Sequence, residues 1–275
     1  MATDFVLWEQ WPIRLKRCRQ GAMLYNINDT YIGRALDSYG EISRGEAELF
    51  GQLLRPSMTA VEIGANIGVH TIALARFVGP QGSVVAFEPQ RIVFQMLCAN
   101  LALNALTNVT AYQSAAGRAP DFLMVPRLDY AKPGNFGGVS LGSAEQGERV
   151  SVVTIDSLAL PSCELLKIDV EGMERDVIEG AMNTIQKFRP RMYVENDRAE
   201  KSRALINRLL GLDYRLYWHL PPLFNCDNFF GEKENVLGNV VSINMLCIPR
   251  SGSLSLTVHG LREITSEDAN WRLAG

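Results

Sequence analysis

Short apolar runs alternate along most of this chain with longer stretches in which apolar residues recur every three or four positions. The short runs are typical of buried strands, and the spaced positions are typical of helices packed on one face. Strands are predicted at residues 59–63, 83–87, 109–113, 165–168 and 191–194, and helices at 69–78, 92–104, 177–188 and 203–210. This alternation predicts βαβ units and an α/β domain with a parallel sheet. Two more apolar runs, 214–218 and 241–248, are expected to close the sheet as an antiparallel pair.

Several segments stand outside this alternation. Ser43 followed by Glu46 has the capping-box pattern, which predicts a helix over residues 43–54. The segment around Lys132-Pro-Gly-Asn-Phe-Gly-Gly138 fits no regular element. We therefore predict one domain over residues 43–250 with loop insertions near 117–149 and 221–239, an N-terminal extension at 1–42 and a C-terminal tail at 251–275.

Composition and charge argue against several classes of protein. The 275 residues have a net charge of −3 with dispersed basic residues, so no nucleic-acid surface is expected. Five widely spaced cysteines without a CxxC pair argue against a disulfide framework and a structural zinc site. The first ten residues lack the basic start and apolar stretch of a signal peptide, and no apolar run approaches the roughly 18 residues of a membrane span. We expect a cytoplasmic enzyme or binding protein.

Candidate cofactor chemistry begins at a glycine-containing turn. Residues 61–68 read Val-Glu-Ile-Gly-Ala-Asn-Ile-Gly, between a predicted strand and its helix, where α/β folds bind nucleotides. Gly64 and Gly68 allow a tight turn and close packing of the helix on the strand. A dinucleotide pyrophosphate needs glycine at the middle position, but Asn66 stands there, which favours S-adenosylmethionine, a cofactor without phosphate. Glu62 can attract the α-amino group of that cofactor, directly or through water.

Glu88 ends the second predicted strand, twenty positions after Gly68. A carboxylate at this place can accept hydrogen bonds from both ribose hydroxyls, as its counterpart does in nucleotide-binding folds. The alternative is that Glu88 caps the following helix. The complete set of predicted cofactor-binding residues is Glu62, Gly64, Ala65, Asn66, Gly68, His70, Thr71, Glu88, Ser114 and Asp169.

These residues are part of a longer set that resembles the FkbM family of methyltransferases. The resemblance lies in Glu62–Thr71, Phe87-Glu-Pro89, Leu166–Glu174, Glu179-Gly-Ala181 and Arg189–Glu195. It extends over roughly residues 40–248, and its most specific part is the run Lys-Ile-Asp-Val-Glu-Gly at 167–172. The first residues, to about position 50, resemble nothing that we can place.

The resemblance implies a class I methyltransferase fold, which is Rossmann-like and has a mostly parallel seven-stranded sheet with helices on both faces. It also implies transfer of a methyl group to a hydroxyl oxygen. Acceptors in such families are sugars of glycolipids, polysaccharides or nodulation factors, and polyketide-type metabolites. The resemblance further suggests that Asn135, Gly137 and Ser140 belong to a loop near the cofactor.

Methyl transfer to a hydroxyl needs an aligned acceptor, exclusion of water and a group that takes the hydroxyl proton. Asp169 and Glu195 end two predicted strands, and Glu171 lies two residues after Asp169. Because ligands of α/β sheets bind at the carboxyl ends of the strands, we expect the three carboxylates to converge beside the sulfonium. The alternative is that Asp169 or Glu171 caps the helix starting near Met173. Glu174 is expected to be a solvated residue of the first helical turn.

A metal ion or a histidine is a further candidate for assisting the reaction. Asp169, Glu195 and Asn196 offer oxygen ligands at adjacent strand ends, a set that suits Mg²⁺ and resembles the ligands of catechol-type methyltransferases. His70 either lines the cofactor pocket or covers its helix. His219 follows the sixth predicted strand and is a candidate base or substrate contact. The third histidine lies in the tail and is expected to have no role.

The acceptor is expected to be a small molecule or a glycan, and a homo-oligomer is an open alternative. Aromatic faces in or near the irregular segments suit stacking on a sugar or an apolar metabolite, and small satellite cores under the loops are an equal alternative. These aromatic residues are Phe136, Trp218, Phe224, Phe229 and Phe230.

Three classes of function compete, and O-methylation of a glycan or natural product is the leading one. A nucleic-acid methyltransferase is the second, although the (Asn/Asp)-Pro-Pro-(Tyr/Phe) motif is absent and Val194-Glu-Asn-Asp197 occupies that strand end. An NAD-dependent oxidoreductase is the third, and Asn66 disfavours it. A binding module without catalysis would leave three strand-end carboxylates without a purpose.

Overall fold

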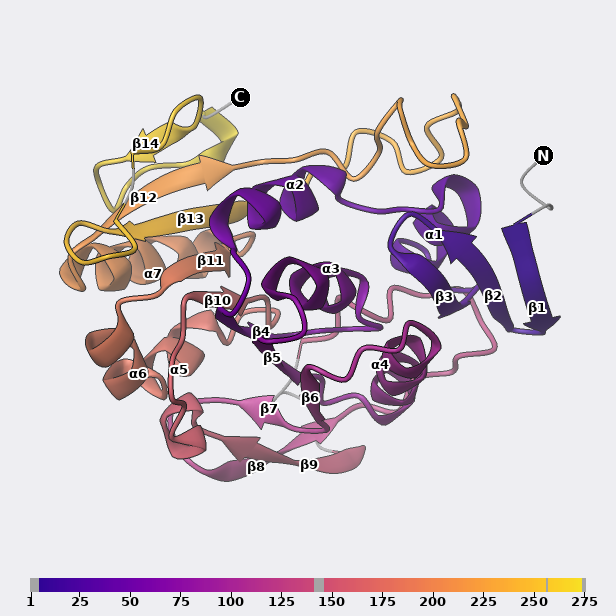
Figure 1. The fold of residues 1–275 in the computed structure, drawn as a ribbon, viewed down its shortest axis with the longest axis horizontal. Coiled ribbons are helices and arrows are strands. Elements are labelled where there is room, and N and C mark those ends of the chain that lie inside the picture. The colour runs from indigo at the N-terminus through magenta and orange to yellow at the C-terminus, as the bar shows by residue number, and fades with distance from the viewer. Residues whose placement is uncertain (1–4, 141–145, 256, 274–275) are drawn as a thin grey trace.

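The computed structural model describes residues 5–140, 146–255 and 257–273. Its centre is an eight-stranded sheet in the order β14-β12-β13-β11-β10-β4-β5-β6 (Figure 1). Neighbours from β6 to β11 pair in parallel, and the pairs β11–β13, β13–β12 and β12–β14 are antiparallel. The strands are β4 (Thr59–Ile63), β5 (Ser83–Phe87), β6 (Val109–Tyr112), β10 (Leu165–Ile168), β11 (Arg191–Glu195), β12 (Tyr214–His219), β13 (Asn244–Pro249) and β14 (Arg262–Ile264).

Helices cover both faces of the sheet because its central strands are apolar on both sides. All five residues of β4 are buried. Val61 and Ile63 face the core under α5, α6 and α7, and Ala60 faces the core under α2 and α3. The helices are α1 (Ile32–Tyr39), α2 (Arg44–Leu53), α3 (Val69–Val78), α4 (Arg91–Leu103), α5 (Glu174–Glu179), α6 (Met182–Phe188) and α7 (Ala199–Gly211). The predicted α/β architecture, a mostly parallel sheet with helices on both faces, is confirmed, and β14 is an eighth strand at one edge.

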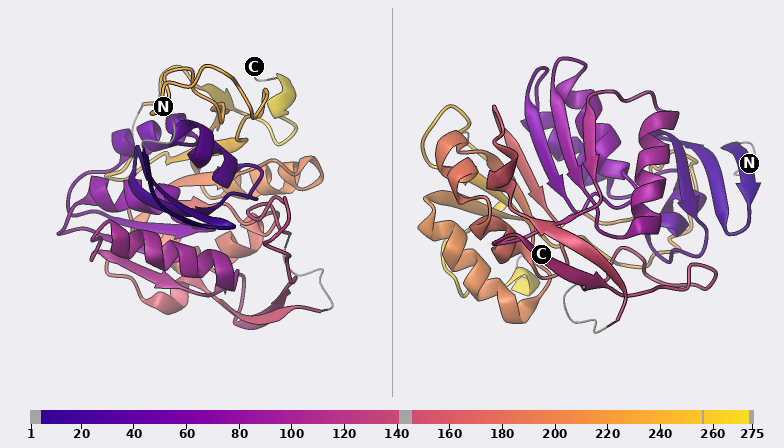
Figure 2. Two further views of the ribbon diagram at one scale, coloured as in Figure 1. Left: turned by 90° about the vertical axis from the view of Figure 1, so that its right-hand side faces the viewer. Right: turned by 90° about the horizontal axis from the view of Figure 1, so that it is seen from below.

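The N-terminal extension folds into a second sheet at one end of the molecule (Figures 1 and 2). Three antiparallel strands form it: β1 (Val6–Gln10), β2 (Ile13–Cys18) and β3 (Gly21–Asn26). Asn100 on α4 ties this sheet to the main domain. Its side chain exchanges hydrogen bonds with the backbone of Leu24 at 2.6 and 2.9 Å, and it donates to the Ile67 carbonyl at 2.8 Å.

The region predicted as the first loop insertion contains regular structure. A small sheet in the order β7-β9-β8 is formed by β7 (Ala115–Ala116), β8 (Asp121–Val125) and β9 (Glu148–Val153). Two short 3₁₀ helices, η2 (Ile155–Leu158) and η3 (Trp271–Leu273), complete the elements of the described residues. All five cysteines are free thiols. In the part of the chain that the structure describes, no helix is long and apolar enough to cross a bilayer.

Two local predictions are wrong. The helix predicted at 177–188 is two helices, because the carbonyl of Gly180 accepts the N–H of Asp156 at 3.0 Å instead of continuing the helical ladder. The capping box is also absent. Ser43 has a left-handed conformation (φ +48°) and makes no side-chain cap, and the side chain of Glu46 turns toward other partners.

Candidate functional site

A cavity of about 490 Å³ lies at the carboxyl ends of the parallel strands. This is the edge where α/β sheets bind ligands, and the volume lies within the usual range for small-molecule sites. The turns after β4, β5, β10 and β11 line one part of it. Residues 42–46 and 241–244 line another part, which we name the second wall. The cavity therefore joins segments from distant parts of the sequence.

The glycine turn after β4 can be built only from residues with special backbone freedom. Gly64 has φ +85°, and a Cβ there would lie 1.8 Å from the carbonyl oxygen of Asp169. Gly68 has φ +90°, and a Cβ would lie 2.6 Å from a methyl carbon of Leu97. Asn66 is left-handed (φ +49°), which asparagine tolerates better than most residues. The turn thus brings β4, β10 and α4 into close contact, as the two glycines predicted.

Glu88 holds two turns together at one side of the cavity. One carboxylate oxygen accepts the N–H of Gln90 at 2.8 Å, and the other accepts the N–H of Asn66 at 3.0 Å. Burial raises the pKa of Glu88 to about 7, and these two hydrogen bonds oppose the rise. Glu88 lines the cavity. It accepts the N–H of Gln90, the residue that precedes α4, and so does not cap the first turn of that helix.

A buried lysine lies beneath the cavity between two carboxylates. Lys167 and Glu62 are side-by-side partners in β10 and β4, and the Nζ of Lys167 lies 3.5 Å from Oε1 of Glu62 and 3.2 Å from Oδ2 of Asp169. Thr71 donates to Oε2 of Glu62 at 2.6 Å. Burial acts to lower the pKa of Lys167, but Asp169 and Glu62 outweigh it and raise the pKa. Oε1 of Glu62 is buried and has no hydrogen-bond partner.

Glu46 on α2 anchors the second wall. One oxygen lies 2.7 Å from Nε2 of His70, and the other accepts the side-chain N–H of Asn244 at 3.0 Å. Burial acts to raise the pKa of Glu46, but His70 and Lys167 outweigh it and bring the pKa down to about 2. Glu46 therefore stays ionised at neutral pH as the partner of His70.

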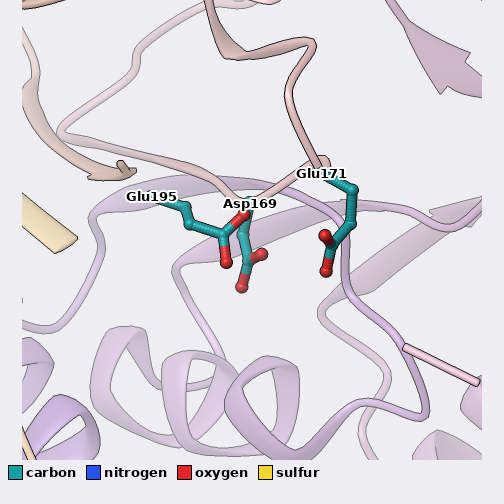
Figure 3. A group of neighbouring side chains, drawn as sticks. All are labelled: Asp169, Glu171 and Glu195. Atoms are coloured by element: carbon teal, nitrogen blue, oxygen red, sulfur yellow. The ribbon is translucent and has the colours of Figure 1, made fainter. Parts of the chain in front are cut away.

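Three carboxylates meet where β10 and β11 end. Each of Asp169, Glu171 and Glu195 offers an oxygen within 4.8 Å of the others, and Figure 3 shows their side chains extending into the same space. Burial and the charge of Asp169 raise the pKa of Glu171 to about 7, against the effect of the ion-paired Arg198. Burial and Asp169 also raise the pKa of Glu195 well above its usual value.

Most of the predicted site residues reach the cavity. The cofactor candidates among its lining residues are Glu62, Gly64, Ala65, Asn66, His70, Glu88, Ser114 and Asp169, joined by Asn135 and Gly137. Gly68 and Thr71 lie behind the lining and support it. Ser140 is exposed and does not line the cavity. Neither does His219, whose Nδ1 lies 2.7 Å from the hydroxyl of Tyr193.

The structure corrects three further expectations. Glu174 is buried instead of solvated, and it accepts the N–H groups of Gly172 and Val170 in the turn after β10. Asn196 is buried and its amide faces Met245, so it does not join the carboxylates. Asp169 and Glu171 do not cap α5, which has no side-chain cap.

The five aromatic candidates serve packing in the part of the chain that the structure describes. Phe136 packs on Tyr130, Phe224 packs on Tyr39, and Trp218 lies in the main core. Phe229 and Phe230 pack on Phe5. None of the five lines the cavity, and its aromatic lining consists of Tyr31 and Phe87.

Sequence reasoning missed Glu46, Lys167 and Arg198 as cavity residues. The signal for Lys167 was its place in the Lys-Ile-Asp-Val-Glu-Gly run, because a lysine in a strand buried on both faces needs a carboxylate beside it. Glu46 carried a signal only for a helix start. Its contact with Asn244 joins residues 198 positions apart, which no local pattern predicts.

Residues 62–216, more than half of the chain, match the family model described as the methyltransferase FkbM domain. This chain belongs to the FkbM methyltransferase family. The resemblance to this family seen in the sequence is confirmed.

The FkbM chain is also similar to individual proteins. Methyltransferase sdnD of Sordaria araneosa is 32% identical in a match covering 44% of this chain and 59% of that protein. Methyltransferase 1 of Beauveria bassiana (strain ARSEF 2860) is 29% identical, over 44% of this chain and 57% of that protein. The chain thus spans less than two thirds of these relatives.

Solved structures of similar fold include methyltransferase FkbM from Methylobacillus flagellatus KT, at 19% identity and a TM-score of 0.48, covering 74% of this chain and 50% of that one. A Streptococcus mutans protein solved in complex with SAH (S-adenosylhomocysteine) has 11% identity and a TM-score of 0.46, with 74% of this chain and 96% of that one covered.

Proposed function

We propose that this FkbM methyltransferase transfers the methyl group of S-adenosylmethionine to a hydroxyl of a sugar, a glycan or a small natural product. The observation that carries the proposal is a pair of carboxylates in one cavity, Glu88 and Glu62. Both oxygens of Glu88 are held in place by backbone N–H groups, and each keeps a lone pair that can accept a ribose hydroxyl. The buried Oε1 of Glu62 has no hydrogen-bond partner and suits the α-amino group of the methyl donor.

The charge of the cavity supports a cationic donor and an acceptor without phosphate. Its lining includes Lys167, Arg198 and His70 as basic side chains, against a larger set of acidic ones. The acidic side chains are Glu46, Glu62, Glu88, Asp169, Glu171, Glu195 and Asp197. A sulfonium is attracted by such a site, whereas the phosphodiesters of a nucleic acid are repelled. This favours a neutral small-molecule or glycan acceptor over a nucleic acid.

The proposed reaction is a single displacement. The acceptor oxygen forms a bond to the methyl carbon while the bond from that carbon to sulfur breaks, and its electron pair returns to sulfur to give S-adenosylhomocysteine. The hydroxyl proton passes to a carboxylate of Asp169, Glu171 or Glu195, which end adjacent strands at the cavity. The transfer needs no metal ion in itself, and the proposal stands without one.

The test combines cofactor titration with an acceptor screen. Calorimetry should show one S-adenosylhomocysteine bound per chain, and Glu62→Gln should weaken binding by at least about tenfold through loss of a charge-assisted hydrogen bond. Glu48→Gln, at an exposed carboxylate on α2, is the matched control and should bind like the wild type. Mass spectrometry with labelled methyl donor should then show methyl gain in hydroxylated glycans or natural products. Absence of binding in the wild type, or methylation confined to nucleic acid, contradicts the proposal.

A further inference from the structure

We infer that Asp169, Glu171 and Glu195 form a binding site for a divalent metal ion that prefers oxygen ligands. The three carboxylates come from the turn after β10 and the end of β11, and each offers an oxygen within 4.8 Å of the others (Figure 3). The sequence pattern pointed to Asp169, Glu195 and Asn196 as ligands. The structure replaces Asn196 with Glu171, because the side chain of Asn196 is buried against Met245.

An unpartnered oxygen gives an independent indication of a missing cation. Oε2 of Glu195 is buried and has no hydrogen-bond partner. Buried carboxylate oxygens in proteins are almost always paired or bound to a metal, since an isolated buried charge is expensive. Two neighbours of Glu195 at this point, Asp169 and Glu171, are themselves carboxylates that repel a negative charge on it.

Two basic side chains touch the cluster, and each is shared between one of its carboxylates and a second carboxylate outside it. Arg198 forms an ion pair with Glu171 and lies 3.4 Å from Asp197. Lys167 contacts Asp169 from below and is shared with Glu62. The sulfonium donor brings a net charge of only about +1, and a divalent ion would add two positive charges directly beside the three carboxylates.

Ligand type and spacing identify the class of ion. The cluster contains carboxylates and neither histidine nor cysteine, which favours Mg²⁺, Mn²⁺ or Ca²⁺ over zinc. Oxygens on opposite sides of Ca²⁺ lie about 4.6–5.2 Å apart, and those around Mg²⁺ about 4.0–4.2 Å apart. The three ligand oxygens lie within 4.8 Å of one another, so a single ion of this class can reach all of them. An ion here would polarise an oxygen of the acceptor.

The experiment uses the full chain, stripped of metal with a chelator, and Mn²⁺ as the probe without methyl donor. Electron paramagnetic resonance titration should show one Mn²⁺ bound per chain, displaced by Mg²⁺ or Ca²⁺. Glu195→Gln should weaken Mn²⁺ binding at least about tenfold, because an amide replaces a charged ligand. Asp197→Asn removes the same charge two residues away and should change binding less than about threefold, since Asp197 is outside the cluster. Glu171→Gln is the second ligand variant if Glu195→Gln does not fold.

Two results overturn the inference: no Mn²⁺ bound at millimolar concentration, or equal binding by wild type and both ligand variants. The methyltransferase proposal is judged separately, by S-adenosylhomocysteine titration in chelator. Binding of S-adenosylhomocysteine without binding of Mn²⁺ rejects the metal site and leaves the proposed function intact. Binding of Mn²⁺ by a protein that does not bind S-adenosylhomocysteine supports the metal site and rejects the proposed function.

Discussion

Lys167 shows how strongly single residues of this site depend on one another. Its side chain is 2% exposed, and its ammonium lies within 3.5 Å of carboxylates from β4 and from the turn after β10. Burying one of these charges alone would cost several kcal/mol, whereas burying opposite charges side by side lets each offset the cost of the other. The site is therefore a balanced cluster in which removal of one charge leaves its partners buried and unpaired.

Replacement of Lys167 by methionine should destabilise the protein by about 3–5 kcal/mol, because Glu62 loses its buried counter-charge. Chemical denaturation monitored by circular dichroism measures this difference. Lys187→Met, at an exposed position on α6, should cost less than about 0.5 kcal/mol. Equal denaturation midpoints for the two variants would show that Lys167 does not balance these charges.

Glu88 should make cofactor binding depend on pH. Burial raises its pKa to about 7, so the carboxyl is mostly protonated below that pH and ionised above it. The ionised form can accept both ribose hydroxyls, and affinity for S-adenosylhomocysteine should therefore fall as pH falls. Between about pH 8 and pH 6 the loss should be about tenfold. Calorimetry at several pH values measures it, and Glu88→Gln should bind weakly with little change over this range. A flat wild-type profile contradicts the assignment.

At the scale of single residues, the sequence predicted which side chains stand at strand ends better than it predicted which side chains contact one another. Asp169, Glu171 and Glu195 converge as expected, because the ends of parallel strands meet at one edge. His219 instead contacts Tyr193 behind the lining, since the local pattern does not say which way a side chain after a strand turns.

Elements are held in register by a few close backbone approaches, and the turn after β4 is the tightest of those at the cavity. A Cβ on Gly64 would overlap the backbone carbonyl of Asp169, which is itself fixed by the pairing of β10 with β4. The turn and the carboxylate cluster are therefore built on the same contact. Any side chain at Gly64 must push the two strand ends apart.

Gly64→Ala should weaken S-adenosylhomocysteine binding at least about tenfold and destabilise the fold by more than the about 1–2 kcal/mol that a left-handed alanine costs. Gly231→Ala is the control, because Gly231 also has positive φ (+72°) but no atom within 4 Å of its would-be Cβ. Thermal denaturation and calorimetry compare the two. Similar losses in both variants would mean that backbone strain alone, and not the overlap with Asp169, accounts for the effect.

Element boundaries followed from periodicity wherever the local pattern was undisturbed, as in β4, α3 and β5. The helix predicted at 177–188 was broken by long-range contacts of Gly180. Its carbonyl accepts the N–H of Asp156, and a Cβ on Gly180 would lie 1.9 Å from the carbonyl oxygen of Gly117. The strand β8 lies in a segment predicted as loop, and it becomes a strand by pairing with β9 across more than twenty residues. Such contacts leave no periodic trace in the sequence.

At the scale of the whole molecule, the second wall brings together two ends of the domain. Residues 42–46 and 241–244 meet through Glu46 and Asn244 and through the hydroxyls of Ser43 and Ser242, 3.4 Å apart. Both segments lie outside residues 62–216, where the chain matches the FkbM family model. Residues inside the matched range thus build one side of the cavity, and residues outside it build the other.

The two sides of the cavity predict where S-adenosylhomocysteine should slow amide exchange. S-adenosylhomocysteine at a concentration of about 100 times its Kd stabilises the bound form by about 2.7 kcal/mol, which can slow amide exchange up to about a hundredfold. Hydrogen–deuterium exchange should therefore slow in residues 62–70 and 88–90 and also in the second wall, because Glu46 and His70 link the wall to the glycine turn at 2.7 Å. The strands β1 and β2 line no part of the cavity and should exchange at an unchanged rate. Protection confined to residues 62–216 would mean that the second wall responds to the acceptor and not to the methyl donor, and acceptor added with S-adenosylhomocysteine should then supply the missing protection.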